Sequence, residues 1–433
     1  MKTHCLISKY KERLKNNIFF QNILVVAGGN TVAKLIGILA TPIITRLYIP
    51  EDYGIYTVFM SIIAITGSIV TLRYSVTIPL AKEEKTADNL IKLCFLVTFC
   101  LSLLWLLIVA IFKGTISDHF QIDNLQQFLW LISIVFLGKG IYETLNSWAI
   151  RNKGFKLITR TKVSQSVSSS VVKIGFGLLK IAPLGLLLGV IAQEIAGIGN
   201  LFSKLRNVRP GFFRNNSLKE IKTVAIRYKD FPLIQSWSQF LLASGAQLPV
   251  ILLGLYYDNQ VVGVFGLAMS MISLPMDLIG QSIAQVYYAE IAKIGKDNSV
   301  KIYNLSISLI KKLFIIGLFP VGLLIAFGPW LFKLVFGPEW FDAGFYARLL
   351  SFMILTRFIS SPIANIFNVY EKQKTQLTLN VIRVLVVLLV FWGSSQLSFS
   401  PMYTIGLYSL AMTLYYGYLS MVVLRVVKNY KRD

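Results

Sequence analysis

The sequence predicts an all-α polytopic membrane protein, with about twelve transmembrane helices in two parallel six-helix halves around a central cavity. Three observations predict this fold. The 433-residue chain is 55% hydrophobic with a mean hydropathy of +0.64, so it carries more apolar surface than a soluble core needs. Apolar stretches near the roughly 20 residues that cross a bilayer follow one another along the chain. Basic residues occupy alternate connections between these stretches.

Each apolar stretch is long enough for a helix that crosses the membrane, and short polar segments separate the stretches. The expected spans are 18–45, 53–80, 89–112, 125–149, 157–180, 183–205, 230–255, 260–289, 302–327, 343–369, 375–396 and 401–425. Little chain is left for domains outside the bilayer.

The net charge of +23 follows from membrane topology. Almost all Lys and Arg residues outside the spans lie in connections on one side, and the opposite connections hold only Arg46, Lys113, Lys180 and Lys333. By the positive-inside rule, this asymmetry places both termini in the cytoplasm. No basic patch belongs to a folded soluble module, so we expect no binding of nucleic acid.

The cysteines and histidines exclude two further kinds of site. The chain has 3 cysteines, an odd number, and Cys94 and Cys100 lie in the third span, so they form no disulfide framework. With 2 histidines it offers no zinc site. We therefore expect neither a metal nor an organic cofactor. The first apolar stretch is too long for a cleavable signal peptide.

The first two spans carry small and charged residues that a lipid-facing helix does not need. Gly28, Gly29 and Pro42 predict a hinge in the first span, the alternative being that the glycines only allow close helix packing. Lys34 lies near the middle of this span, and Arg73 lies in the second. Both lack an acidic partner on their own helix, which favours a position facing an aqueous cavity.

The third span is almost entirely apolar, which favours a lipid-facing position, but the next three are more polar. Lys139 and Glu143 lie one turn apart in the fourth span, where an ion pair between them is the alternative to ligand binding. The fifth is rich in serine over 164–170, a composition that lets helices approach closely. The sixth carries Glu194.

The longest and most basic cytoplasmic connection divides the spans into two equal sets. We expect an N-terminal six-helix bundle over 1–205, a basic linker over 206–229 and a C-terminal six-helix bundle over 230–433. An even number of spans in each half starts both halves in the cytoplasm. The repeats are therefore parallel and related about an axis along the membrane normal.

The second half also places polar side chains within apolar spans. Trp237 lies on a polar face of the seventh span, Asp277 in the eighth and Arg357 in the tenth. Such residues are costly against lipid and are expected to face inward. Lys311 and Arg383 lie nearer the cytoplasmic ends of their spans, from which long basic side chains reach the interface.

A short polar break, RLYIPEDYGIY from Arg46 to Tyr56, separates the first two spans. Pro50 cannot continue a helix, and Asp52 suits the N-cap of a helix that begins at Tyr53, so the segment predicts a tight helical hairpin. A similar pattern recurs in the second half, where Leu255-Tyr256 is followed by Asp258, Gly263, Phe265 and Met269. The two hairpins indicate a duplicated chain.

At these hairpins the chain resembles the oligosaccharide flippase family, the O-antigen (Wzx-type) transporters of the multidrug/oligosaccharidyl-lipid/polysaccharide exporter superfamily. The family's Arg-Leu-x-x-Pro-Glu-Asp/Glu-x-Gly-x-Tyr hairpin is matched from Arg46 to Tyr56, and its second hairpin resembles Leu255 to Met269. The stretch Phe336-Gly337-Pro338-Glu339-Trp340 is similar to the loop before the family's tenth helix. The likeness in hydropathy and spacing covers nearly all of the chain.

The resemblance implies a flippase rather than an enzyme. Its substrate would be an undecaprenyl-diphosphate-linked oligosaccharide, such as an O-antigen repeat unit, moved by alternating access from the cytoplasmic to the periplasmic leaflet of the bacterial inner membrane. The resemblance thus implies a role in polysaccharide or lipopolysaccharide biosynthesis. It also implies a proton or sodium as coupling ion, and the lipid bilayer, a polysaccharide polymerase and a chain-length regulator as partners.

The charges within the spans suit such a substrate, because Lys and Arg outnumber Asp and Glu there. Lys34, Arg73, Lys139 and Arg357 are the candidate ligands of a diphosphate, with a structural ion pair as the alternative.

Four further side chains have candidate roles. Asp277 and Glu194 are candidates for binding the coupling ion, and the alternative is that they pair with the surplus cations. Trp237 and Tyr287 are candidates for stacking on sugar rings, against the commoner role of inward aromatic residues in packing.

Two other classes of function are alternatives. A drug or cation exporter of the same superfamily would need an acidic interior rather than a cationic one. A membrane polysaccharide polymerase or lipid-dependent glycosyltransferase would need a sizeable outer loop with catalytic acids or bases. The largest outer connections, 113–124 and 328–342, are short and poor in such pairs.

Overall fold

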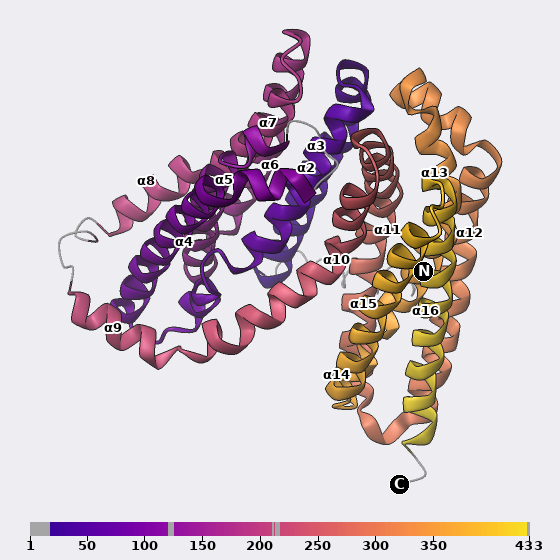
Figure 1. Cartoon of the computed structure of the whole chain (residues 1–433). Helices are drawn as coiled ribbons and strands as arrows, with labels where there is room; N and C mark the ends of the chain where they lie inside the picture. The colour runs from indigo at the N-terminus through magenta and orange to yellow at the C-terminus, as the bar shows by residue number, and fades with distance from the viewer. Residues whose placement is uncertain (1–17, 120–124, 210–211, 213–216, 431–433) are drawn as a thin grey trace, which may run out of the picture. The chain divides into compact units, whose positions relative to one another are not determined.

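The computed structural model describes residues 18–119, 125–209, 212 and 217–430 (Figure 1). The α-helices are α2 (Ile18–Leu47), α3 (Pro50–Thr66), α4 (Glu84–His119), α5 (Leu131–Arg151), α6 (Phe155–Leu178), α7 (Leu184–Ile195), α8 (Ile198–Val208), α9 (Leu218–Arg227), α10 (Ser236–Tyr256), α11 (Asn259–Ile294), α12 (Ser299–Phe336), α13 (Phe341–Ile363), α14 (Ile366–Val369), α15 (Gln373–Gln396) and α16 (Pro401–Asn429). The described residues contain no β-strand. The all-α fold class is confirmed.

Within the described residues, 9 helical segments are long and apolar enough to cross a membrane. They are Pro50–Ile69, Glu84–Ile111, Leu184–Val208, Phe231–Tyr256, Asn259–Ile294, Lys296–Phe336, Pro338–Val369, Gln373–Gln396 and Pro401–Asn429. Helices α2, α5 and α6 are also long, with 30, 21 and 24 residues, but α5 and α6 carry charged and hydroxyl side chains along their length. Together these helices match the expected spans one for one, as in a multi-pass membrane protein.

Two of the expected spans are interrupted. The second, 53–80, leaves the α-helix after Thr66 and continues as the 3-10 turns η1 (Gly67–Ile69) and η2 (Tyr74–Leu80). The sixth, 183–205, breaks at Gly197, whose φ of 87° separates α7 from α8. Hydropathy reports the length of an apolar stretch and cannot locate a turn within it.

By its internal contacts the described chain divides into two compact units. The first contains α2 and the described residues between Phe59 and Ser244. The second contains Ile49–Val58, which begin α3, and the described residues from Gly245 onward. The expected division into 1–205, 206–229 and 230–433 stays a prediction about the internal repeat.

In the first unit, small residues bring α2 and α6 together. A Cβ atom on Gly29 would lie 2.9 Å from Thr159 Cβ in α6, so only glycine fits there. Further along the same pair of helices, Ser166 Oγ donates a hydrogen bond to Ala33 O at 2.6 Å. The serine-rich stretch of α6 therefore contributes to a helix–helix interface.

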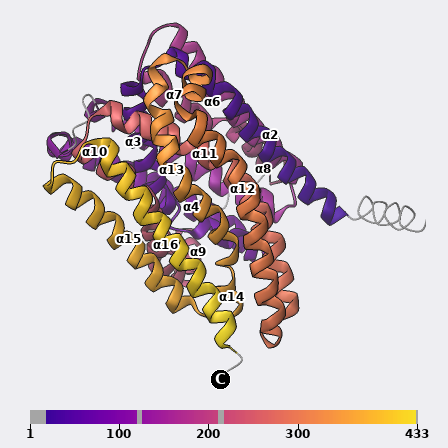
Figure 2. The same cartoon turned by 90° about the vertical axis from the view of Figure 1, so that its right-hand side faces the viewer.

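In the second unit, α13 is the central helix and packs against α11, α12 and α16 (Figure 1). Helix α15 runs beside α16 (Figure 2). A hydrophobic core that includes Ile291, Ile302, Phe367 and Val423 joins one end of these helices. Beyond this core, α13 presents polar side chains toward both α11 and α15, and these form the site described below.

Both expected hairpins are tight turns between long helices. Helix α3 begins at Pro50, earlier than the predicted start at Tyr53, so Asp52 is not its N-cap. The Asp52 carboxylate instead accepts a hydrogen bond from the N–H of Ile49 at 3.4 Å, reaching back over the start of the helix. In the second hairpin, Asp258 is the N-cap of α11 and accepts a backbone N–H of its first turn at 2.9 Å.

Candidate functional site

The first cluster of charged residues surrounds the break in the second span, and its backbone is strained. Leu72 and Arg73 have φ values of 46° and 61°, in the left-handed region that residues with a Cβ atom rarely adopt. A carboxylate from α5 holds the adjoining turn. Glu143 Oε1 accepts a hydrogen bond from Ser75 Oγ at 2.6 Å and another from Thr71 Oγ1 at 3.3 Å.

Lys139 lies one turn before Glu143 on α5, but it extends toward a different neighbour. It crosses the end of α3, where a Cβ atom on Gly67 would lie 3.0 Å from the Lys139 Cδ. Lys139 and Lys162 both act electrostatically on Glu194 of α7. The structure thus brings together two predicted site residues, Lys139 and Glu194, within the first unit.

Arg73 and Lys34 are partly buried cations of the first unit. Arg73 Nε is buried, and no hydrogen-bond partner for it lies in the described part of the chain. Among the described residues, no carboxylate lies within ion-pair distance of either side chain. Contact of these two cations with an anionic ligand stays a prediction.

The second cluster lies inside the second unit, around Arg357 of α13. Arg357 Nη2 lies 3.2 Å from Oδ1 and 3.5 Å from Oδ2 of Asp277 on α11. This ion pair borders a cavity of about 160 Å³ between α11 and α13, to which Gln281 also contributes. The pair is only partly shielded, because 37% of the Arg357 side chain and 41% of the Asp277 side chain stay exposed.

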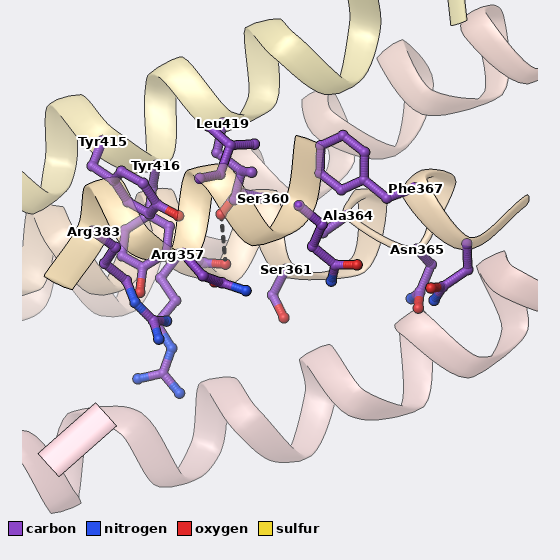
Figure 3. Close-up of a pocket in the computed structure, with 14 residues that line it drawn as sticks. Arg357, Ser360, Ser361, Ala364, Asn365, Phe367, Arg383, Tyr415, Tyr416 and Leu419 are labelled. Atoms are coloured by element: carbon purple, nitrogen blue, oxygen red, sulfur yellow. Dashed lines mark hydrogen bonds between the residues drawn. The ribbon is translucent and has the colours of Figure 1, made fainter. Parts of the chain in front are cut away.

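A larger cavity of about 280 Å³ lies on the other side of Arg357, between α13, α14, α15 and α16. Its lining is Arg357, Ser360, Ser361, Ala364, Asn365, Phe367, Asn368, Gln376, Leu379, Asn380, Arg383, Tyr415, Tyr416 and Leu419. Figure 3 shows Arg357, Arg383 and the two tyrosines at one end and Asn365 with Phe367 at the other. The lining contains two guanidinium groups and no carboxylate.

Sequence reasoning missed two residues of these clusters. Lys162 was not among the predicted site residues, yet it lies on α6 with its ammonium 4.9 Å from the centre of the Tyr142 ring. Arg383 was expected to reach the cytoplasmic interface, yet it lines the larger cavity. The signal for Arg383 was present: Gln376, Asn380 and Arg383 recur at i, i+4 and i+7 and form one polar stripe on an apolar helix.

The two aromatic residues predicted to contact sugar lie in different units, and neither lines the two cavities. Trp237 is 63% exposed at the start of α10 and makes an edge contact with Phe240. Tyr287 is 4% exposed in the core of the second unit, and its hydroxyl lies 2.6 Å from Ser306 Oγ. Their contact with sugar stays a prediction.

The structure distinguishes the three predicted hinge residues of α2. A Cβ atom on Gly28 would meet nothing within 4 Å, whereas one on Gly29 would collide with Thr159. Pro42 lies inside a helix that continues to Leu47. Packing therefore explains Gly29, and the hinge stays a prediction for Gly28 and Pro42.

Comparison with protein families decides the affiliation of the chain. Residues 43–344 match the model of a family described as polysaccharide biosynthesis protein. The chain belongs to the polysaccharide biosynthesis protein family. The match covers both hairpins on which the resemblance to polysaccharide transporters was based, and that resemblance is confirmed. A comparison with curated protein sequences finds no significant match.

Several solved structures align with nearly the whole length of this chain. The lipid II flippase MurJ, in an inward closed conformation, superposes with a TM-score of 0.70 at 13% identity, over 94% of this chain and 91% of that one. A multidrug resistance MATE family transporter of the MOP superfamily, in an inward-facing conformation, has a TM-score of 0.67 at 16% identity, over 92% and 95%. A MOP superfamily transporter from Pyrococcus furiosus has a TM-score of 0.54 at 16% identity, over 95% and 96%. At these identities the likeness shows a shared fold.

Proposed function

We propose that this protein is a flippase for an undecaprenyl-diphosphate-linked oligosaccharide, such as an O-antigen repeat unit. It would move this substrate by alternating access from the cytoplasmic to the periplasmic leaflet of the bacterial inner membrane, with both of its own termini in the cytoplasm. The family and the fold support a transporter in polysaccharide biosynthesis. The observation that carries the proposal is the presence of guanidinium groups without carboxylate partners inside the spans.

An isolated cation in the membrane interior is costly, so such residues pair with an acid, face water or bind an anionic ligand. Arg73 and Arg383 have no ion-pair partner among the described residues, and each has a buried Nε that donates to nothing there. Arg357 has one acid, Asp277. A diphosphate would supply the missing negative charge, and its oxygens match the planar fork of arginine.

The same charges argue against an exporter of cationic drugs. The lining of the larger cavity contains no acid, and the acid at the smaller one is already paired with Arg357. A cationic substrate would be repelled by Arg357 at the smaller cavity and by Arg357 and Arg383 at the larger one. The charge pattern therefore favours an anionic substrate.

Asp277 and Glu194 are the proposed groups for coupling to a proton or sodium gradient. Each carboxylate lies beside cations that belong to the proposed substrate site: Asp277 beside Arg357, and Glu194 beside Lys139. If a phosphate of the substrate replaced the carboxylate as the partner of the cation, the carboxylate would be free to bind a proton or sodium. Binding of substrate and of the coupling ion would then be linked through a shared cation.

Reconstitution tests the function directly. The purified full-length protein is placed in liposomes that contain a fluorescent undecaprenyl-diphosphate-linked oligosaccharide, and a membrane-impermeant quencher reports the fraction in the outer leaflet over time. The expected result is exchange between leaflets that empty liposomes lack. Liposomes that export a cationic dye but leave the lipid-linked oligosaccharide in place would favour the drug exporter instead.

A further inference from the structure

The lining of the larger cavity in the second unit is charged at one end and polar but uncharged at the other. Along α15, the side chains of Gln376, Asn380 and Arg383 share one face. Seven residues of α-helix separate the first from the last, a rise of about 10 Å. The guanidinium groups of Arg357 and Arg383 lie at one end, and Asn365 lies at the other (Figure 3).

The charged end favours an anion. It carries two guanidinium groups and no carboxylate among the lining residues, and because Arg357 already pairs with Asp277, the charge of Arg383 is the one left to be neutralised. Arg383 Nε is buried without a hydrogen-bond partner in the described chain, so one donor at this end is still unused. A phosphate group offers the charge and the several acceptor oxygens that two arginine forks require.

The other end favours a neutral, hydroxyl-rich group. Asn365, Asn368, Gln376 and Asn380 place four carboxamides along the cavity, and each can both donate and accept hydrogen bonds. Sugar hydroxyls have the same dual capacity. Tyr415 and Tyr416 add aromatic and hydroxyl surface beside the arginines.

The size of the cavity limits the ligand. Its volume of about 280 Å³ is close to the lower end of the roughly 300–1,000 Å³ of typical small-molecule sites. One sugar ring with its phosphate suits this space, and a complete oligosaccharide does not. We propose that this cavity, inside the second unit alone, binds the first sugar and its phosphate from a lipid-linked saccharide. The lipid-linked origin of the ligand rests on the proposed function, but the sugar phosphate chemistry does not.

Binding of soluble fragments to the purified full-length protein tests the cavity. The probes are N-acetylglucosamine 1-phosphate, inorganic phosphate and N-acetylglucosamine, measured by calorimetric titration into protein in nanodiscs. The sugar phosphate should bind most tightly, inorganic phosphate more weakly and the neutral sugar weakest of all. Equal affinity for the three probes, or no binding of the sugar phosphate, would overturn the proposal.

Variants test which end of the cavity binds the phosphate and which binds the sugar. Arg383→Gln should weaken binding of the sugar phosphate by roughly tenfold to a hundredfold, the loss expected for one charge-assisted hydrogen bond. Arg383→Lys, which keeps the charge in case the Gln variant does not fold, should weaken it less. Gln376→Ala, about 10 Å along α15 from Arg383, should weaken the sugar phosphate while leaving inorganic phosphate unchanged. Arg425→Gln is the matched control, because Arg425 is an exposed arginine of α16 outside the cavity lining. If Arg383→Gln binds the sugar phosphate as tightly as Arg425→Gln does, the cavity is not the site.

A competition experiment separates this inference from the proposed function. N-acetylglucosamine linked through a diphosphate to a short prenyl chain should displace the soluble probe; failure to displace it would overturn the lipid-linked origin. If the soluble probe binds through Arg383 but liposomes show no exchange of lipid-linked oligosaccharide, the cavity stands and the flippase proposal fails. If liposomes show exchange and the probe does not bind, the flippase stands and the cavity proposal fails.

Discussion

Gly54 of the first hairpin and Gly263 of the second lie against one another within the second unit. A Cβ atom on Gly263 would lie 2.8 Å from the backbone nitrogen of Gly54, and one on Gly54 would lie 3.0 Å from the Asn259 Cα. The two glycines that mark the repeated hairpin motif therefore meet at one crossing of α3 and α11. At both glycines of the repeat, a side chain would collide with the backbone of the other hairpin.

Substitution at this crossing should destabilise the protein. Gly263→Ala would force a methyl group into backbone atoms that cannot rotate away, and overpacking of this kind costs about 1–3 kcal/mol. Thermal unfolding in detergent should show a lower midpoint. Gly322→Ala in α12 is the control, because a Cβ atom there meets nothing within 4 Å. Equal midpoints for the two variants would contradict the close crossing.

The hinge of α2 can be separated from packing by single substitutions. Gly28→Ala adds a methyl group in open space within a helix, so it should not lower thermal stability, and it should slow transport if the helix bends there. Gly29→Ala should lower stability because of Thr159, and Thr159→Ser, which removes the nearest methyl group, should restore part of it. Normal transport by Gly28→Ala would show that bending at this residue is not needed.

Arg73 should be needed for transport and not for folding. Arg73→Ala removes a guanidinium group that has no ion-pair partner among the described residues, so transport should fall by roughly tenfold or more with normal protein levels. Arg73→Lys should recover only part of the activity, because the bidentate fork is lost. Glycan display in cells measures the effect. Arg160→Ala, which removes an exposed arginine of α6, is the control and should be normal. Normal display by Arg73→Ala would show that transport does not need Arg73.

Glu143 should stabilise the broken second span through its oxygen atoms. Glu143→Leu leaves the buried hydroxyls of Thr71 and Ser75 without this acceptor, a loss of about 1–3 kcal/mol. Glu143→Gln keeps an amide oxygen at the same place and should retain most of the stability. Thermal unfolding of both variants provides the measurement. A midpoint for the Leu variant equal to that of the Gln variant would exclude this role.

Coupling to an ion gradient should depend on Asp277 or Glu194. Asp277→Asn keeps the shape of the side chain but cannot bind a proton or a sodium ion as a carboxylate does, so transport into liposomes should no longer respond to the gradient. Glu194→Gln tests the second candidate in the same assay. Asp230→Asn, at an exposed acid, is the control. Retention of the gradient response by both test variants would remove these two residues from the coupling step.

Hydropathy and charge asymmetry were enough to predict the fold class, because long apolar helices have few alternatives in a bilayer. The hairpins were predicted for a local reason, since Pro50 and the polar residues around it limit where a helix can begin. The start of α3 was still wrong by three residues, and the role of Asp52 with it. Capping depends on which backbone N–H groups at the start of the helix lack a partner. The same residues are compatible with several neighbouring start positions of α3, so the sequence does not select one of them.

The sequence by itself determined which spans hold charge and that cations exceed acids among them. It did not determine their partners. Glu143 accepts hydrogen bonds from hydroxyl groups in the broken second span and does not pair with Lys139. Arg383 lines the same cavity as Arg357, which lies 26 positions earlier in the chain. Periodicity assigns a side chain to a face of its own helix, but the neighbour on that face depends on how other helices pack. Only the tertiary structure decides which charges meet, because helix packing follows small residues such as Gly29 and Gly67, whose neighbours lie far away in the sequence.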